Sequence, residues 1–245
     1  MNSPRSNLER FSDRAGAYSL YRPGYPAQAL DALFEDLGDE TQLTVADVGA
    51  GTGISTQLLA QRVKLAIAIE PNAAMRSKAA PLSNSQWRDG TAESTGLPDK
   101  HVDVAAAFQA FHWFDAPVAF AELTRIARRR IGLLQYERDE AQRFSSEYAR
   151  VIRPYMLDDT EGLRLRALEK FARLAGGRLR RHAVAYSQRL DLEALLGRVD
   201  SSSYLPRTGP DAERLRAEVR GLFEHFREHD AVEMAMICHV LTSDV

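Results

Sequence analysis

The fold of this chain is decided by the stretch Val45-Ala46-Asp47-Val48-Gly49-Ala50-Gly51-Thr52-Gly53, which Glu70 follows seventeen residues later. An apolar run rich in β-branched residues passes through an acid into three glycines. An amphipathic segment comes next, and a second apolar run ends on Glu70. The pattern predicts a strand, a helix and a second strand. Since parallel α/β sheets bind ligands at the carboxyl ends of their strands, both strand ends are expected to meet a ligand.

The glycines at alternate positions, Gly49, Gly51 and Gly53, predict a turn without side chains, which lets a ligand approach the backbone closely. The next helix is expected to begin at about Ile54 and to present unpaired N-terminal amides to that ligand. Glu70, at the end of the second strand, can accept both hydroxyl groups of a ribose. These features predict a nucleoside site; the alternative is an ordinary strand–helix turn with a surface acid.

The register of the glycines separates the possible cofactors. A dinucleotide fingerprint needs a glycine at the sixth position. Counted from Gly49 that position is Ile54, and counted from Gly51 it is Thr56, so a pyrophosphate site is disfavoured. A P-loop needs a lysine after the last glycine, and none follows. Asp47, just before the glycines, favours a cationic ligand over a phosphate.

The bulk composition sets the broad class of protein. With 245 residues and 44% hydrophobic content, the chain supports one large α/β domain with room for a helical insertion. The net charge of −2 indicates no field that would attract nucleic acid or a membrane. We expect no signal peptide, no membrane span and no metal. The single cysteine, Cys238, cannot form an internal disulfide, so we expect a cytoplasmic protein.

Apolar periodicity and turn residues predict alternating strands and helices, and hence an α/β fold with a mostly parallel sheet. The expected strands are Thr44–Val48, Leu65–Glu70, Ser85–Asp89, Val102–Phe108, Ile131–Tyr136, Ala183–Leu190 and Val232–Leu241. The expected helices are Ala27–Leu37, Ile54–Gln61, Asn72–Ala80, Pro117–Ile126, Ala141–Tyr155, Glu161–Ala175, Leu192–Val199 and Asp211–Glu228.

With these elements placed, the chain resembles the class I S-adenosylmethionine (SAM) methyltransferases of the small-molecule type, also called methyltransferase type 11. Within them it is most similar to the branch of trans-aconitate- and ubiquinone-type enzymes. Asp47 and the three glycines, which precede helical sequence, resemble the first motif of the family. Glu70 resembles the acidic motif that follows it. Further stretches that match family motifs are Tyr18–Pro26, Glu70–Met75, Gly90–Glu93, Leu97–Asp99, Ala107–Phe114 and Ser201–Pro206.

The resemblance implies a Rossmann-like α/β fold. Its sheet has seven mostly parallel strands, helices on both faces and an antiparallel last strand. We expect a single domain over residues 1–245, with a helical cap inserted after strand five, over the cofactor end of the sheet. Its expected parts are N-terminal lid helices (1–40), a cofactor-binding core (41–138), the cap (139–180) and C-terminal elements that complete the sheet (181–245).

The chain departs from the family pattern at two places. Many relatives carry an acid where Thr91 stands, so the Thr91 hydroxyl or the Ala92 backbone would have to hold the adenine amine. Many relatives also carry Pro-Gly-Gly before strand five, where this chain has the run from Ala127 to Gly132. The turn there is expected to be tighter or differently built.

The resemblance implies that the cofactor is SAM and assigns residues to it. Met75 is expected near the adenine, and Arg22 near the methionine carboxylate. The alternative is that Pro23 and Gly24 simply end a helix, which is compatible with that role of Arg22. The expected cofactor-binding residues are Asp47, Gly49, Ala50, Gly51, Gly53, Glu70, Pro71, Met75, Thr91, Ala92, Glu93, Gln109, Tyr21 and Arg22.

The acceptor side is assigned to a second group of residues. His112 is the candidate catalytic base, because the pKa of an imidazole lies near neutrality; the alternative is that it only packs locally while Trp113 fills the core. Tyr136 and Arg138 can orient an anion or a hydroxyl, or are a strand-end tyrosine and a surface arginine. The expected substrate residues are Tyr18, Phe111, His112, Trp113, Tyr136 and Arg138.

We therefore expect a metal-independent enzyme that transfers a methyl group from SAM to a small molecule, by O-methylation of a carboxylate or hydroxyl. Alternatives are a methyltransferase acting on RNA or protein, or a non-catalytic SAM-binding protein. The basic run Arg164–Arg181 is the feature that favours a macromolecule, but it lacks the interleaved aromatic residues that stack on bases. We expect no nucleic-acid or membrane partner, and a monomer or homodimer.

Overall fold

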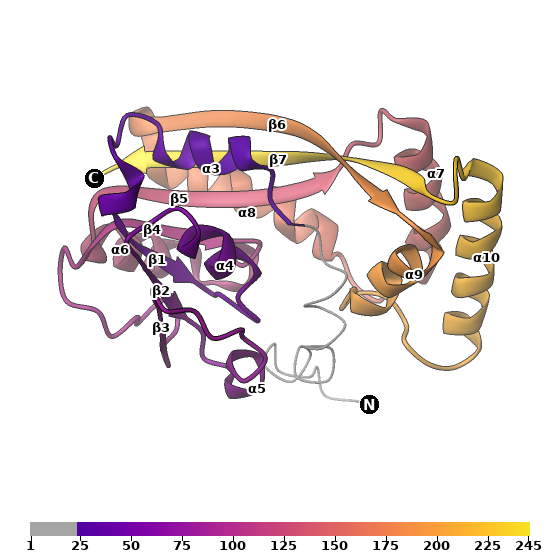
Figure 1. Cartoon of the computed structure of the whole chain (residues 1–245), viewed down its shortest axis with the longest axis horizontal. Coiled ribbons are helices and arrows are strands. Elements are labelled where there is room, and N and C mark those ends of the chain that lie inside the picture. The colour runs from indigo at the N-terminus through magenta and orange to yellow at the C-terminus, as the bar shows by residue number, and fades with distance from the viewer. Residues whose placement is uncertain (1–23) are drawn as a thin grey trace. The chain divides into compact units, whose positions relative to one another are not determined.

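The computed structural model describes residues 24–245, and the statements below concern that part of the chain. Seven strands form one sheet in the order β3-β2-β1-β4-β5-β7-β6 (Figure 1). The strands are β1 Thr44–Val48, β2 Leu65–Ile69, β3 Ser85–Arg88, β4 Val102–Phe108, β5 Ala127–Arg138, β6 Leu179–Leu190 and β7 Val232–Asp244. The first five strands pair in parallel, and β7 runs antiparallel to its neighbours. The predicted fold class is confirmed.

From β1 to β5 the helices lie between the strands as predicted, and β4 follows β3 without a helix between them. The α-helices are α3 Ala27–Phe34, α4 Ile54–Ala60, α5 Ala73–Arg76, α6 Ala116–Ile126, α7 Arg143–Ile152, α8 Thr160–Ala175, α9 Leu192–Ser201 and α10 Pro210–Phe226. Short 3-10 turns lie at η1 Glu40–Gln42, η2 Phe111–Trp113, η3 Arg153–Tyr155 and η4 Gly176–Arg178.

Three helices are clearly shorter than predicted. Helix α7 spans Arg143–Ile152 and not Ala141–Tyr155, because a 3-10 turn follows it at Arg153–Tyr155. Helix α3 ends at Phe34 and not at Leu37, because Asp36 and Gly38 have positive φ angles of 61° and 77°, which a helix cannot contain. Helix α5 ends at Arg76 and not at Ala80. The chain continues beyond α5 in turns of the i to i−3 type instead of the α-helical pattern.

Strand β5 begins at Ala127, so the predicted start at Ile131 is wrong. Charged residues can form the beginning of this strand because each of their side chains has a hydrogen-bond or ion-pair partner. The buried guanidinium of Arg130 donates to Asp244 at 2.7 Å and to the carbonyl oxygen of Leu33 at 3.0 Å. The tight connection expected before strand five is confirmed, since β5 follows α6 without an intervening residue.

The chain divides into two compact units. We call residues 24–135, 161–184 and 238–245 the sheet unit, and residues 136–160 and 185–237 the helical unit. Of the predicted cap at residues 139–180, α7 belongs to the helical unit and most of α8 to the sheet unit. The predicted single-domain organisation stays a prediction.

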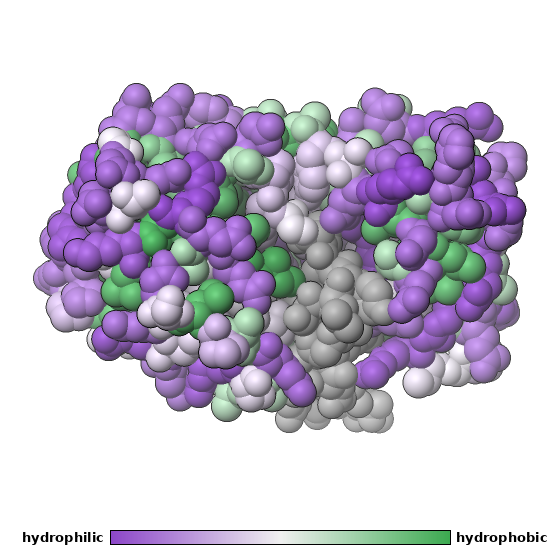
Figure 2. Space-filling view, in the orientation of Figure 1, coloured by the Kyte–Doolittle hydropathy of each residue, from purple (hydrophilic) through white to green (hydrophobic). Residues whose placement is uncertain are grey.

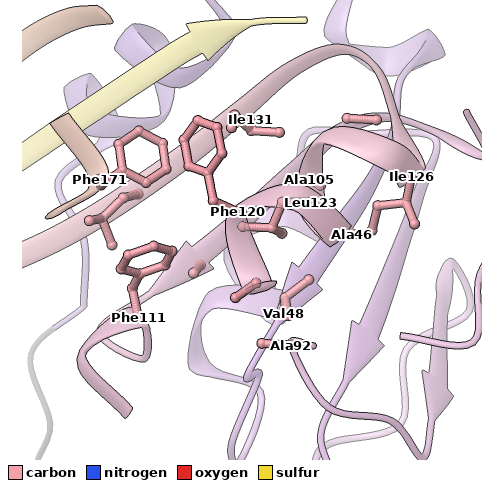
Figure 3. Packing of buried hydrophobic residues seen from close by; sticks show 14 of the residues in the cluster. Ala46, Val48, Ala92, Ala105, Phe111, Phe120, Leu123, Ile126, Ile131 and Phe171 are labelled. Carbon is pink, nitrogen blue, oxygen red and sulfur yellow. The ribbon is translucent and has the colours of Figure 1, made fainter. Parts of the chain in front are cut away.

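The sheet unit is built around one apolar cluster (Figure 3). Alternate residues of β1, such as Ala46 and Val48, point into this cluster because side chains of a strand alternate between its faces. Helices α6 and α8 cover it with Phe120 and Phe171, whose rings meet edge to face at 5.4 Å. Burying one such phenylalanine contributes about 1.5–3 kcal/mol. Two adjacent helices are thereby fixed to one face of the parallel strands.

The opposite face of the sheet carries α3. Gly132 lies one residue from Ile131 of the cluster and therefore faces the other side of β5. A Cβ atom at Gly132 would lie 2.5 Å from Cδ1 of Leu33. A side chain at position 132 would therefore require the Leu33 side chain to move. The prediction of helices on both faces of the sheet is confirmed.

The helical unit contains α7, α9 and α10, of which α10 contacts both others. The rings of Phe144 and Phe226 meet edge to face at 5.6 Å and join α7 to α10. The hydroxyl of Ser145 donates to the carbonyl oxygen of Ala235 at 3.0 Å and ties α7 to β7. This unit thus has its own packed interior.

Polar and charged residues dominate the face drawn in Figure 2. In residues 24–245, the large hydrophobic side chains that are exposed are Val118, Leu157, Leu165 and Leu174. No helix of this part of the chain is both long and apolar enough to span a bilayer.

Candidate functional site

The glycine turn between β1 and α4 has the backbone that its sequence predicts. Gly49, Gly51 and Gly53 have φ angles of 77°, 60° and 87°, which side chains strongly disfavour. A Cβ atom at Gly49 would also lie 2.7 Å from Cβ of Ala110, and one at Gly53 would lie 2.9 Å from the ring of Trp87. The outer two glycines are therefore required by packing as well as by conformation.

Glu70 links the end of β2 to this turn. Its carboxylate accepts the backbone N–H of Gly51 at 2.9 Å with one oxygen, and that of Asn72 at 2.9 Å with the other. Strands β1 and β2 pair with Val48 opposite Ile69, so the two predicted acids lie at the same edge of the sheet. Burial raises the pKa of Glu70, and the two backbone N–H groups oppose that shift.

Asp47 is fully buried at the end of β1. Its Oδ2 accepts the hydroxyls of Ser55 at 2.7 Å and Thr56 at 2.6 Å, which fixes the first turn of α4. Its Oδ1 has no hydrogen-bond partner within the described residues. Burial raises the pKa of Asp47 to about 6, against the two hydroxyl bonds, and the charge of Glu70 adds to the rise. One oxygen thus serves the fold, and the other is left without a donor.

Sequence reasoning missed Ser55 and Thr56. Their signal was available, because two hydroxyl residues at the start of a helix, directly after an acid–glycine turn, can reach back to the acid. The carboxylate of Asp47 therefore has a structural role in addition to the predicted one toward a ligand.

The segment after Glu70 positions an apolar side chain beside the glycines. Asn72 caps α5 by accepting the N–H groups of Ala74 at 2.9 Å and Met75 at 3.3 Å. Met75 is buried, and its Cε would lie 3.4 Å from a Cβ atom at Gly51. Pro71 lies between the acid Glu70 and the capping residue Asn72. The roles of Pro71 and Met75 in cofactor binding stay predictions.

The residues predicted to surround the adenine lie in the loop after β3. The hydroxyl of Thr91 accepts the N–H of Ser94 at 3.2 Å, Ala92 is buried in the apolar cluster, and Glu93 accepts the N–H of Asp115 at 2.9 Å. Each side chain thus has a partner within the protein. Their contacts with a cofactor stay predictions.

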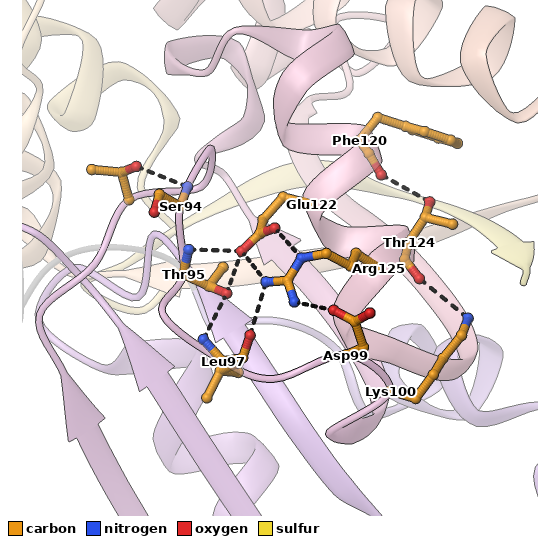
Figure 4. A network of polar contacts seen from close by, with 10 residues as sticks. Ser94, Thr95, Leu97, Asp99, Lys100, Phe120, Glu122, Thr124 and Arg125 are labelled. Carbon is orange, nitrogen blue, oxygen red and sulfur yellow. Dashed lines mark hydrogen bonds and ion pairs between the residues drawn. The ribbon is translucent and has the colours of Figure 1, made fainter.

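This loop is held in place by a polar network that sequence reasoning missed (Figure 4). Glu122 accepts the backbone N–H of Thr95 at 2.8 Å and its hydroxyl at 2.6 Å. Arg125 donates to Glu122 at 2.7 Å and to the carbonyl oxygen of Leu97 at 2.8 Å. The bonds from Arg125 hold the pKa of Glu122 down at about 2. The signal was an acid and an arginine three residues apart on α6.

The segment after β4 separates the predicted substrate residues. Gln109 has a φ angle of 51°, and its N–H donates to the carbonyl oxygen of Leu134 at 2.9 Å. Phe111 is 1% exposed and meets Phe171 edge to face at 5.5 Å (Figure 3). His112 and Trp113 are half-buried, with ring centroids 4.6 Å apart. The position of Phe111 favours packing, while His112 and Trp113 keep partial exposure.

Tyr136 and Arg138 belong to the helical unit. Tyr136 is buried, and the side chain of Arg138 is only 8% exposed. The alternative that Arg138 is a surface arginine is therefore wrong. Tyr18, Tyr21 and Arg22 lie outside the described residues.

Other chemistry has little support within residues 24–245. These residues hold no group of three or more His, Cys, Asp or Glu side chains arranged to bind a metal ion. Burial raises the pKa of the Cys238 thiol to about 12, so this cysteine is protonated at neutral pH.

The parallel sheet, the glycine turn and the acid at the end of β2 together define the fold of a class I methyltransferase. A family model described as a methyltransferase domain matches residues 46–130. An uncharacterized methyltransferase of Mycobacterium tuberculosis is 33% identical over 199 residues, which are 79% of this chain and 76% of that protein. This chain belongs to the methyltransferase family.

Two further similar proteins have a lower sequence identity but match a larger share of this chain. An uncharacterized methyltransferase-like protein of Schizosaccharomyces pombe is 26% identical over 242 residues, covering 95% of this chain and 93% of that protein. The solved structure of a proposed type II methyltransferase from Anaeromyxobacter dehalogenans has a TM-score of 0.69 and 24% identity. It covers 91% of this chain and 98% of its own. The resemblance to trans-aconitate- and ubiquinone-type enzymes stays a prediction.

Proposed function

We propose that this protein transfers a methyl group from SAM to a small molecule, and that the accepting atom is a carboxylate or hydroxyl oxygen. The observation that carries the proposal is the unpartnered Oδ1 of Asp47, fully buried at the glycine turn. Leaving such an atom without a donor costs about 1–3 kcal/mol. A cationic ligand with N–H donors offsets that cost, and SAM carries an ammonium group.

The residues around the turn suit the remaining parts of SAM. The two oxygens of Glu70 each accept one backbone N–H and retain lone pairs for ribose hydroxyls. Gly51 has no side chain to block the approach of a ligand to its backbone. The buried thioether of Met75 offers an apolar, polarizable surface to a base.

The methyl group of SAM is attached to a sulfonium and leaves by in-line displacement. The protein's contribution is therefore alignment of the acceptor and exclusion of water. His112 takes the proton if the acceptor is a hydroxyl. If the acceptor is a carboxylate, no base is needed, and His112 positions the acid instead.

A macromolecular acceptor has less support. Helix α8 buries Ala167, Phe171 and Ala175, while Arg166 and Lys170 are exposed. Charged residues opposite a buried stripe are the ordinary pattern of a surface helix. The basic run therefore gives no specific reason to place RNA or protein on this face.

The test is a transfer assay with methyl-labelled SAM, the full-length protein, and separate pools of small metabolites, RNA and protein. We expect label in the small-molecule pool. Label in RNA or protein instead would overturn the acceptor class. SAM binding without label in any pool would leave a non-catalytic binding protein.

A control variant separates specific transfer from background methylation. Glu224 lies exposed on α10, far in sequence from the glycine turn, and pairs with Arg227. Glu224→Ala should label the same pool as the wild type. Loss of labelling in Glu70→Ala together with its retention in Glu224→Ala would assign the transfer to the predicted site.

A further inference from the structure

The helical unit contains a buried arginine that lacks a counter-ion. Arg198 on α9 is 7% exposed. Its guanidinium donates to Oε1 of Gln188 on β6 and, at 3.4 Å, to the sulfur of Met236 on β7. Within the described residues no carboxylate lies at ion-pair distance from it. Arg198 was not among the residues that the sequence singled out.

This arrangement is unusual for a buried charge. A guanidinium has five N–H donors, while an amide oxygen is a neutral acceptor and a thioether sulfur a weak one. Buried charges are normally paired, because their desolvation cost is large without compensation. An arginine stays charged at neutral pH even where burial lowers its pKa, as it does for Arg198. The helical unit therefore contains a cation whose partner is missing.

A second arginine adds to the positive charge. The like charge of Arg138 acts on Arg198 and contributes to the lowering of its pKa. Glu140 lies 3.8 Å from Arg138, but it binds Arg153 more closely, at 2.6 and 2.7 Å. Glu140 is thus shared between Arg138 and Arg153.

Aromatic residues also lie near the two arginines. The guanidinium of Arg138 lies 5.8 Å from the ring centre of Tyr148 on α7. Tyr136, Tyr148 and Tyr204 are the phenol groups whose electrostatic effect reaches Arg198, and all three are buried. Rings and hydroxyls together suit an organic molecule with one anionic end. They suit a strongly hydrated inorganic dianion less well.

We propose that Arg198 binds the carboxylate of a small organic molecule in the helical unit, where the charge of Arg138 adds to the attraction. Arginine matches a carboxylate with two parallel N–H bonds, which gives both strength and orientation. The inference rests on the proposed function and deepens it, because it names an anionic group on the molecule that the protein takes. Its test runs without SAM, so it fails or succeeds independently of methyl transfer.

The experiment titrates full-length protein with acetate, benzoate or succinate at constant ionic strength and follows the thermal unfolding midpoint. Inorganic phosphate and chloride are the comparison ions. We expect at least one carboxylate to raise the midpoint in a saturable way. Absence of a saturable response to every carboxylate, or an equal response to phosphate, would overturn the proposal.

Substitutions then assign the response to the arginine. Arg198→Met keeps an unbranched side chain that resembles the arginine stem but removes the charged guanidinium, and should weaken carboxylate binding at least tenfold. Arg198→Lys keeps a charge without the fork and should weaken it less. The matched control is Arg150→Met, on α7 of the same unit, where an exposed arginine pairs with Glu147. Equal carboxylate responses in wild type and Arg198→Met would contradict the assignment.

The unliganded variants give a second readout. Removing an uncompensated buried charge should raise the midpoint of Arg198→Met by roughly 2–4 °C. A midpoint well below that of the wild type would show that Arg198 serves the fold and would overturn the proposal. If Arg198→Met does not fold, Arg198→Lys alone decides the binding question, because an unchanged affinity in that variant excludes a bidentate site.

Discussion

The glycine turn of the sheet unit contains a buried acid, whereas the helical unit contains a pair of buried arginines, so the two regions hold buried charges of opposite sign. At the turn, Asp47 is a buried acceptor without a donor on one oxygen. In the helical unit, Arg198 is a buried donor without an anionic acceptor. The first needs a cation and the second an anion. The comparison teaches that each unit contains a buried ionisable group whose charge its own residues do not neutralise, and for each of these groups we propose a ligand of opposite charge.

Arg130 shows that a buried arginine by itself is no sign of a site. Arg130 is 1% exposed and, like Arg198, lies in a packed interior. Unlike Arg198, it pairs with Asp244 and with carbonyl oxygens of α3 and of the residue that follows this helix. We predict that Arg130→Met destabilises the protein by about 3–5 kcal/mol, because the carbonyl oxygens of Leu33 and Glu35 lose their donor and Asp244 keeps only Arg180. Urea unfolding measures the loss. A change below about 1 kcal/mol would remove the contrast with Arg198.

Glu70→Ala tests the cofactor side of the comparison. We expect SAM affinity to fall by more than about a hundredfold, since the variant loses two charge-assisted hydrogen bonds to the ribose. Calorimetry measures the change, with Glu224→Ala as the control. Because Glu70 also holds the N–H groups of Gly51 and Asn72, Glu70→Gln serves as the variant of similar shape. Unchanged affinity in Glu70→Ala would remove the ribose assignment.

His112→Ala tests whether the residues after β4 act on the acceptor or only pack. We expect kcat to fall by roughly a hundredfold, the lower end for general acid–base catalysis, while the Kd for SAM changes less than about twofold. Turnover and calorimetry on the same preparation measure the two effects. Phe111→Leu is the matched control for packing, because Phe111 lies in the apolar cluster. Wild-type turnover in His112→Ala would leave that residue a packing role.

The pKa of Asp47 predicts the smallest effect. A cation prefers the ionised carboxylate, whose pKa in the free protein is about 6. SAM affinity should therefore be nearly constant above pH 7 and fall about tenfold between pH 7 and pH 5. The same raised pKa means that ionising Asp47 costs folding stability as pH rises from about 4 to 6. Calorimetry across this range checks the slope, and Asp47→Asn should abolish it. If the SAM affinity of the wild type does not change with pH, the proposed contact between Asp47 and the cation is wrong.

The two regions also differ in how far their residues lie apart along the chain. The turn, Glu70 and Met75 lie within one strand–helix–strand unit, so local patterns predicted both its geometry and its ligand class. The arginine pair is assembled from β5 and α9, with neighbours from β6, β7 and α7. No local pattern marks such a group, and the sequence suggested Arg138 only as a residue just past a strand.

Some details within the predicted site also depended on packing. The pattern Phe111-His112-Trp113 placed three neighbours on the acceptor side, but the 3-10 turn directs Phe111 into the cluster with Phe171 of α8. The early start of β5 depended on Asp244, more than a hundred residues away in the chain. Distant partners decide such features, and a single sequence does not name them.

By itself, the sequence determined the parallel sheet, the positive φ angles of the three glycines and the placement of Asp47 and Glu70 at the same end of neighbouring strands. Hydrophobic periodicity and glycine's conformational freedom act over a few residues, so they can be recognised locally. Tertiary structure alone decided which buried polar groups are satisfied. Arg130 and Arg198 are the same residue type in similar burial, and partners that are distant in the chain distinguish them. Arg130 has a carboxylate and two carbonyl oxygens, whereas Arg198 has an amide oxygen and a sulfur.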